Sequence, residues 1–333
     1  MTRKCFSTLL TIILLFGVVF SATAGSKMKV GLVTDVGKID DRTFNEFAYK
    51  GMIRAGQDFN LETSFIETLQ PTDYDKNIEQ FVSEGYQVII TVGFMLGDAT
   101  KRMAAKYPHV KFVIVDFAYD PAIDNVLGLL FAEDQAGFLA GALAGMMTKE
   151  NMIGFVGGKE IPPVIRYRVG YKAGAKYANP GCDVLTVHID SFTDPARGKT
   201  AALSQMEEGA DIIFGCGGPT GSGAILGAAQ AGAWVVGVDQ DEYFTTFKEG
   251  KMPGAEKLIT SAMKRVDNAV YNGVKTAVEG TFKGGIYLSN IDNEGIGLAP
   301  YNKAAGSIPA DVQAKMKTIY ADLKAGKFNH LLK

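Results

Sequence analysis

Short apolar runs alternate with helix-length amphipathic segments from residue 29 onward. In the first half, strands are predicted at 29–34, 63–67, 88–91, 111–115 and 126–130, and helices near 43–58, 73–84 and 97–106. Strands that alternate with helices are typical of parallel sheets covered by helices on both faces. The pattern therefore predicts an α/β fold, with one doubly wound sheet in the first half.

The second half repeats this order of elements. A helix at 136–147, rich in Gly and Ala, leads to strands predicted at 152–156, 183–187, 212–214 and 234–238, with helices near 163–178, 196–208 and 221–231. The halves share order and spacing but no run of identical residues. We therefore expect a structural repeat and a second sheet of the same kind.

The last part of the chain is expected to return to both sheets. It predicts a long helix at 258–279, a strand at 286–288 and a helix at 308–327. The expected N-terminal lobe is 25–132 with a return segment near 258–284, and the expected C-terminal lobe is 133–257 and 285–333. Such returns would make the connection between the lobes a multi-stranded hinge.

The first residues predict an export signal. Arg3 and Lys4 form a basic region, 9–20 is apolar, and small residues at 22–24 suit a signal peptidase, so 1–24 is expected to be a signal peptide cleaved after Ala24. A membrane anchor is the alternative, but a span needs about 20 apolar residues. Cys5 precedes the apolar run and is lost with the signal, which predicts a soluble product without a lipid anchor.

Charge and cysteine content exclude several function classes. With 36 Asp and Glu against 34 Lys and Arg, the chain has no positive field to hold nucleic acid. Three Cys and three His are too few for a zinc finger or a disulfide framework, so no metal or cofactor is predicted. Beyond residue 24 only Cys182 and Cys216 remain, and their positions beside predicted strands favour free buried thiols over a disulfide.

Acidic residues follow three of the predicted strands directly: Asp35, Asp116 and Asp239. Ligands of open parallel sheets lie beyond the carboxyl ends of the strands, and a carboxylate there is partly buried unless something pairs with it. Acids converging on one cleft suggest a neutral, hydroxyl-rich ligand. Phe44, on the loop after the first strand, offers a face on which a base can stack.

Structural roles compete with these assignments. Asp40 and Asp41 precede a predicted helix and are equally well explained as helix caps. Phe44 has an alternative role as a core residue of that helix.

Enzyme motifs fail on spacing. The Arg197-Gly198-Lys199-Thr200 run has Thr193 where a phosphate loop needs its leading Gly. Ser261 and Lys264 match S-x-x-K of serine acyl enzymes, but the chain has neither S-D-N nor K-T-G. The sequence therefore predicts a binding protein and not an enzyme.

Several motifs together carry a family resemblance. They are the D-D-x-[ST]-F-N pattern at 40–45, the Gly157-Gly158 turn with 166–171 after it, Phe192-Thr193-Asp194, and G-V-D-x-D at 237–241. The chain resembles the Bmp (basic membrane protein) family of substrate-binding proteins, which includes purine nucleoside receptors of ABC transporters. The resemblance covers residues 28 to about 328.

The resemblance implies a periplasmic-binding-protein type I fold, with two hinged lobes closing on a nucleoside. The base would stack between aromatic rings, with Tyr167 opposite Phe44 and Phe192 or Phe214 as other choices for that ring. Asp116 would form hydrogen bonds with the edge of the base, and Gly217 would lie beside the ribose. Asp239 would bind the ribose hydroxyls, and Lys264 would contact a ribose oxygen or Asp239. The implied ligand-binding residues are Asp35, Phe44, Asn45, Asp116, Tyr167, Gly217, Asp239 and Lys264.

The predicted function is that of a periplasmic receptor, soluble and monomeric, that captures a purine nucleoside by hinge closure. Adenosine, guanosine or inosine would be delivered to an ABC permease in the inner membrane. The alternatives are a free purine base, a flavin or a sugar as cargo on the same scaffold, a periplasmic nucleoside hydrolase, or a ligand sensor.

Overall fold

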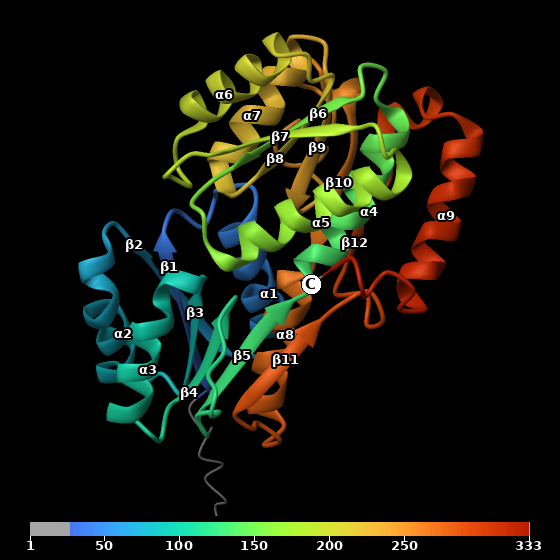
Figure 1. Cartoon of the computed structure of the whole chain (residues 1–333). Helices are drawn as coiled ribbons and strands as arrows, with labels where there is room; N and C mark the ends of the chain where they lie inside the picture. Colours follow the sequence, from blue (N-terminus) through green and yellow to red (C-terminus); the bar gives the residue numbers. More distant parts are fainter. Residues whose placement is uncertain (1–26, 333) are drawn as a thin grey trace, which may run out of the picture.

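The computed structural model describes residues 27–332, which form two lobes, each built on a six-stranded sheet (Figure 1). The predicted signal peptide lies outside the described residues. Among the described residues, no helix has both the length and the apolar character needed to cross a bilayer.

The first sheet is parallel throughout and has the strand order β11-β5-β4-β3-β1-β2. Its strands are β1 (Lys29–Val36), β2 (Glu62–Thr68), β3 (Val88–Val92), β4 (Lys111–Val115), β5 (Val126–Phe131) and β11 (Gly285–Ser289). Helices α1 (Phe44–Asp58) and α8 (Val266–Val278) pack together on one face, and α2 (Tyr74–Ser83) and α3 (Gly97–Lys106) on the other. Successive side chains of β1 point to opposite faces of the sheet, so the strand contributes to the core on each face. Leu32 and Val33 accordingly belong to different hydrophobic clusters.

The second sheet repeats this arrangement, with the order β12-β10-β9-β8-β6-β7. Its strands are β6 (Met152–Gly157), β7 (Asp183–His188), β8 (Ile212–Cys216), β9 (Trp234–Asp239), β10 (Leu258–Lys264) and β12 (Ile296–Leu298), of which β12 alone is antiparallel to its neighbour. Helices α4 (Glu133–Met147) and α5 (Pro162–Ala178) cover one face, and α6 (Pro195–Glu207) and α7 (Gly218–Gln230) the other. The predicted α/β fold and structural repeat are confirmed.

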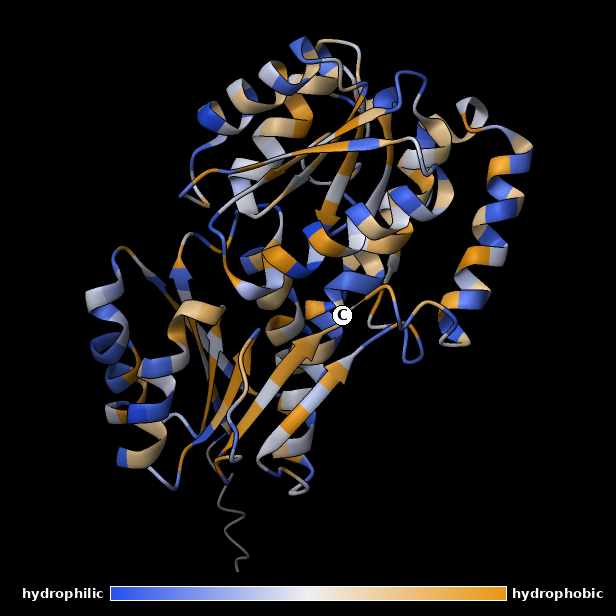
Figure 2. Cartoon of the chain, in the orientation of Figure 1, coloured by the Kyte–Doolittle hydropathy of each residue, from blue (hydrophilic) through white to orange (hydrophobic). Residues whose placement is uncertain are grey.

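Three connections join the lobes within the described residues. α4 follows β5 of the first sheet but packs on α5, β10 and β12 of the second, and α8 follows β10 but packs on α1 and β4 of the first. The third connection runs from β11 to β12. The inner strands of each sheet, such as β3 and β8, are largely apolar, whereas the outer helix faces are polar (Figure 2). The final helix, α9 (Ala310–Lys324), packs on α4 of the C-terminal lobe.

The long helix predicted at 258–279 is wrong. Residues Leu258–Lys264 form β10, and α8 begins only at Val266. Nearly every side chain of this short run is buried. Its sequence therefore lacks the alternation of apolar and polar residues that distinguishes a strand from a helix, which explains the error. The lobe boundaries change with it: β10 belongs to the second sheet and β11 to the first, so the return to the N-terminal lobe is made by α8 and β11 instead of 258–284.

Candidate functional site

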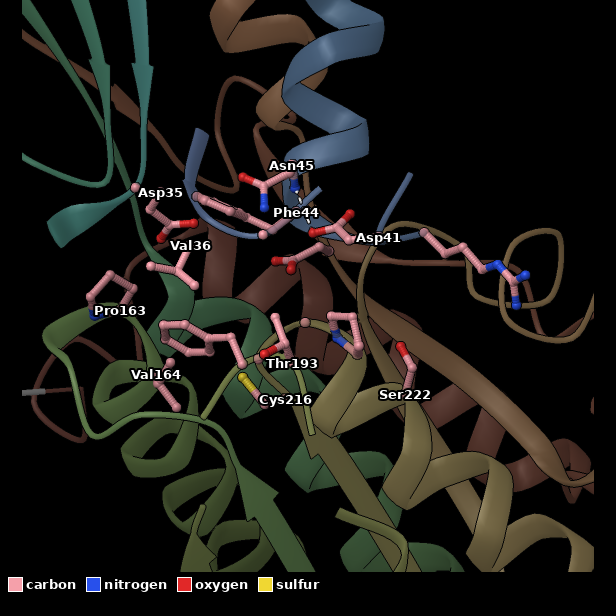
Figure 3. A pocket seen from close by; sticks show the side chains of 18 of the residues that line it. Asp35, Val36, Asp41, Phe44, Asn45, Pro163, Val164, Thr193, Cys216 and Ser222 are labelled. Atoms are coloured by element: carbon pink, nitrogen blue, oxygen red, sulfur yellow. Dashed lines mark hydrogen bonds between the residues drawn. The ribbon is translucent and has the colours of Figure 1, made fainter. Parts of the chain in front are cut away.

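A cavity of about 480 Å³ lies between the two lobes, at the carboxyl ends of the strands. Figure 3 shows side chains from the N-terminal lobe, such as Asp35 and Phe44, facing Thr193 and Cys216 of the C-terminal lobe across it. The structure brings together every predicted site residue in the wall of this one cavity: Asp35, Phe44, Asn45, Asp116, Tyr167, Gly217, Asp239 and Lys264.

Asp41 organises the wall contributed by the first lobe. Its carboxylate accepts hydrogen bonds from the backbone N–H groups of Thr43, Asn45 and Glu46, at 2.9 to 3.0 Å, and so holds the start of α1. The capping role expected for Asp41 is confirmed. Because α1 begins at Phe44, this cap presents Phe44 and Asn45 to the cavity. Phe44 is only half-buried, unlike its neighbour Phe47, which belongs to the core.

Asp35 is held in a protonated state near neutral pH. Burial raises the pKa of its carboxyl to about 8, the charges of Asp41 and Asp116 add to that rise, and the Asn45 amide partly opposes it. Gly93 lies close by, because a Cβ there would come within 2.5 Å of an Asp35 oxygen. A neutral Asp35 is able to donate a hydrogen bond as well as accept one.

Lys264 joins the lobes through a buried ion-pair cluster. Its Nζ lies 2.7 Å from the Asp116 carboxylate and 2.9 Å from Oε1 of Glu133, and Nε of Arg166 lies 2.7 Å from Oε2 of Glu133. Lys264 is 2% exposed and Glu133 is fully buried. Burial opposes a charged Lys264, but Asp116 and Glu133 outweigh it and raise its pKa. Burial also raises the pKa of Asp116 to about 6, although Lys264 opposes that rise.

Sequence reasoning missed Glu133. The predicted helix begins at residue 136, so Glu133, two residues after the end of the fifth strand, was not assigned to the set of strand-end acids. α4 in fact begins at Glu133. The same signal that singled out Asp35 and Asp116, an acid after an apolar strand, was present there.

Asp239 faces the cavity from the second lobe and remains available to a ligand. Its backbone is left-handed (φ 63°) and the residue is 5% exposed. Burial raises the pKa of its carboxyl to about 7, while Lys264 opposes the rise. Lys264 forms its ion pairs with Asp116 and Glu133, and within residues 27–332 the Asp239 carboxylate has no hydrogen-bond or ion-pair partner. An acceptor of this kind suits a donor on a ligand.

The three candidates for the second ring differ in position. Tyr167 lines the cavity but is 2% exposed, and its hydroxyl donates to the Ala262 carbonyl at 3.3 Å. Phe192 lines the cavity and is half-buried. Phe214 is fully buried and is not part of the cavity wall. Of the three, Phe192 therefore offers the most ring surface to a ligand.

Gly217 caps α7 and brings two backbone segments close together. Its φ is 102°, and a Cβ there would meet the Gly158 nitrogen at 2.9 Å. The preceding Cys216 also lines the cavity. Cys216 and Cys182 are both buried and free, as predicted. Within the described part of the chain, no group of three or more His, Cys, Asp and Glu is placed to hold a metal ion.

Comparisons with known proteins agree on one family. The model of the Bmp family, described as ABC transporter substrate-binding protein PnrA-like, matches residues 28–321. The chain is 33% identical to the ABC transporter nucleoside-binding protein BmpA of Lactococcus lactis subsp. cremoris, covering 91% of each chain. It is 30% identical to the CD4+ T-cell-stimulating antigen of Listeria monocytogenes, covering 95% of each.

Solved structures show which fold the chain shares. A solute-binding protein of an ABC transporter system from Aeropyrum pernix superposes with a TM-score of 0.81 at 25% identity, covering 90% of this chain and 92% of that one. The arabinose-binding protein AraP from Geobacillus stearothermophilus shares the fold at a TM-score of 0.62 and 14% identity, covering 85% of this chain and 100% of that one. These neighbours confirm the periplasmic-binding-protein type I fold. With its two lobes and interlobe cavity, the chain belongs to the Bmp family of ABC transporter substrate-binding proteins, which are extracytoplasmic receptors and not enzymes.

Proposed function

We propose that this protein captures a purine nucleoside between its lobes and delivers it to an ABC permease. The observation that carries the proposal is the position of Phe44 and Asp239 in the wall of one cavity, on opposite lobes. An aromatic face suits a base, and a carboxylate suits vicinal hydroxyls of a ribose. The Lactococcus relative is named a nucleoside-binding protein, which supports the same ligand class.

In this proposal the two lobes divide the recognition of the ligand. Phe44 and Phe192 stack on the faces of the base, and Asp239 accepts hydrogen bonds from the ribose. Asp35, protonated near neutral pH, and Asn45 interact with polar atoms of the base. Asp116 is paired with Lys264, so both contribute through one neutralised pair and not as two separate charges.

The proposed cellular setting is the periplasm, with the protein soluble, monomeric and released by cleavage of its signal peptide. The relatives include proteins named basic membrane protein A and a lipoprotein, so lipid anchoring is the alternative. Fractionation of the native host with mass spectrometry of the mature N-terminus distinguishes them. An unmodified N-terminus near residue 25 supports the proposal, and recovery only in the membrane fraction with a lipid modification contradicts it.

Native mass spectrometry of freshly purified protein tests the ligand class. The expected adduct has the mass of a purine nucleoside, and it is released intact on denaturation. An adduct with the mass of a flavin, a sugar or a free base would identify another cargo. Incubation of the complex for several hours is expected to return unchanged nucleoside, because a transport receptor makes and breaks no covalent bond.

A further inference from the structure

The Gln240 side chain connects the two lobes beside the cavity. Its Nε2 donates to the carbonyl oxygen of Thr43 at 2.7 Å, and its Oε1 accepts from Nζ of Lys50 at 3.0 Å. Gln240 follows β9 of the C-terminal lobe, whereas both partners belong to the N-terminal lobe: Thr43 directly precedes α1, and Lys50 lies in the second turn of that helix. Gln240 is only 5% exposed and its bond to the Thr43 carbonyl is buried, whereas the Lys50 side chain is about half exposed, so the Lys50 bond is open to solvent and the Thr43 bond is the stronger part of the connection.

Both ends of this connection are next to residues of the candidate site. Gln240 directly follows Asp239, and Thr43 directly precedes Phe44. The Thr43 carbonyl also accepts from the N–H of Phe47 at 3.1 Å, which is the first turn of α1. The hydrogen bond from the Gln240 amide therefore joins two segments of the candidate site. One carries Asp239 of the C-terminal lobe, and the other carries Phe44 of the N-terminal lobe.

We propose that Gln240 is an interlobe latch, a positioning residue that stabilises the closed arrangement of the lobes over the ligand. The inference rests on the proposed function and extends it to a residue with no direct role in contacting the ligand. Both bonds require the lobes to be together, so they favour the closed state over an open one and leave the stability of each lobe unchanged. A contact of this kind shifts the population of closed protein and slows ligand release.

Two variants separate the parts of the latch. Gln240→Met keeps the length of the side chain and removes both hydrogen bonds. Gln240→Glu keeps an acceptor for Lys50 but, when ionised, has no donor for the Thr43 carbonyl. Gln205→Met is the matched control: Gln205 is also 5% exposed, and its Nε2 donates to the Phe155 carbonyl at 3.1 Å within the C-terminal lobe.

The rate constants for a bound purine nucleoside, measured by stopped-flow fluorescence, test the latch. Gln240→Met and Gln240→Glu are expected to raise koff by about tenfold, because both lose the buried hydrogen bond to the Thr43 carbonyl, with kon changed by less than about twofold. Gln205→Met is expected to lower Tm without changing koff. A koff equal to that of the wild type in both Gln240 variants, or the same rise in koff in Gln205→Met, would overturn the proposal.

Failure of the latch is distinguishable from failure of the proposed function. If the wild type binds no nucleoside, the proposed function is wrong, and the latch is tested in ligand-free protein. Spin labels at the exposed positions Lys101 on α3 and Lys199 on α6 report the distance between the lobes. Loss of the short-distance population in Gln240→Met supports the latch, and distance distributions identical to those of the unsubstituted chain overturn it.

Discussion

Asp116 and Asp239 occupy equivalent positions in the two sheets, and both have left-handed backbones, with φ of 67° and 63°. Asp116 follows β4 and Asp239 ends β9, each the third strand from the same side of its sheet. Their electrostatic surroundings differ, because Lys264 pairs with Asp116 and not with Asp239. The two lobes share a fold but differ in the charges around these two aspartates. Asp239 of the C-terminal lobe is the one that stays available to a ligand.

Asp239→Asn is therefore expected to weaken nucleoside binding without weakening the fold. Losing the ionised carboxylate as acceptor of the ribose hydroxyls is expected to cost about 1.5–3 kcal/mol, measured by calorimetry at pH 8, above the Asp239 pKa of about 7. Asp241→Asn is the control, because Asp241 accepts from Asn302 and the Tyr243 N–H and does not line the cavity. Equal losses of affinity in the two variants would show that Asp239 does not contact the ligand.

Lys264→Met is expected to destabilise the protein by about 3–5 kcal/mol, because it leaves the buried carboxylates of Asp116 and Glu133 without their shared cation. Lys264 holds down the pKa of Asp116, so without it that pKa rises further and the loss is expected to be larger at pH 8 than at pH 5. Urea denaturation at both pH values measures it. Lys251→Met, which breaks an exposed pair with Glu249, is expected to change nothing measurable. A Lys264 variant that unfolds like the wild type would show that the cluster has no role in stability.

Phe44→Ala is expected to reduce nucleoside affinity by about 1–3 kcal/mol through lost stacking, with little change in Tm. Phe47→Ala, three residues along the same helix, removes a core ring and is expected to lower Tm instead. Thermal unfolding and calorimetry on both variants separate the two effects. The reverse pattern would assign Phe44 to the core.

The second stacking ring is tested by comparing Phe192→Ala with Tyr167→Phe. Phe192 offers more ring surface to the cavity, so its loss is expected to lower affinity by about 1–3 kcal/mol. Tyr167→Phe removes only the bond from its hydroxyl to Ala262 and is expected to leave affinity nearly unchanged. A large loss of affinity in Tyr167→Phe alone would show that Tyr167, and not Phe192, is the second aromatic residue that binds the ligand.

Asp35 is expected to make stability depend on pH. Its folded pKa of about 8 lies above the usual 3.8, so the folded state binds the extra proton between these values. The stability that it contributes is fully present below about pH 4 and is lost as the pH rises toward 8, by at most about 1.4 kcal/mol per pH unit. Asp35→Asn is expected to flatten this slope in urea denaturation measured from pH 4 to 8. A variant with the slope of the wild type would show that Asp35 is ionised when folded.

The sequence predicted the repeated sheets well because most strands are apolar runs bounded by polar turns. It failed at 258–279, where β10 is buried on nearly every side chain and has no period to distinguish it from a helix. That one error also displaced the predicted lobe boundaries, since β10 and β11 return to different sheets.

The strand-end rule located Asp35, Asp116 and Asp239, because the carboxyl ends of parallel strands meet at one edge. The rule could not predict that Lys264 pairs with Asp116 and Glu133, because those contacts depend on how the two lobes are placed against each other. Gln240 lies inside the G-V-D-x-D motif, but its partners Thr43 and Lys50 are almost 200 residues earlier in the chain. Contacts between lobes are set by the tertiary fold and leave no local signal.

Isothermal titration calorimetry with adenosine, guanosine, inosine, uridine and ribose measures directly whether the protein binds a purine nucleoside. We expect at least one purine nucleoside to bind with a Kd of about 1 μM or lower, equivalent to about −8 kcal/mol, and ribose alone to bind far more weakly. Absence of binding by all three purine nucleosides, in protein stripped of co-purified ligand and correctly folded, would contradict it.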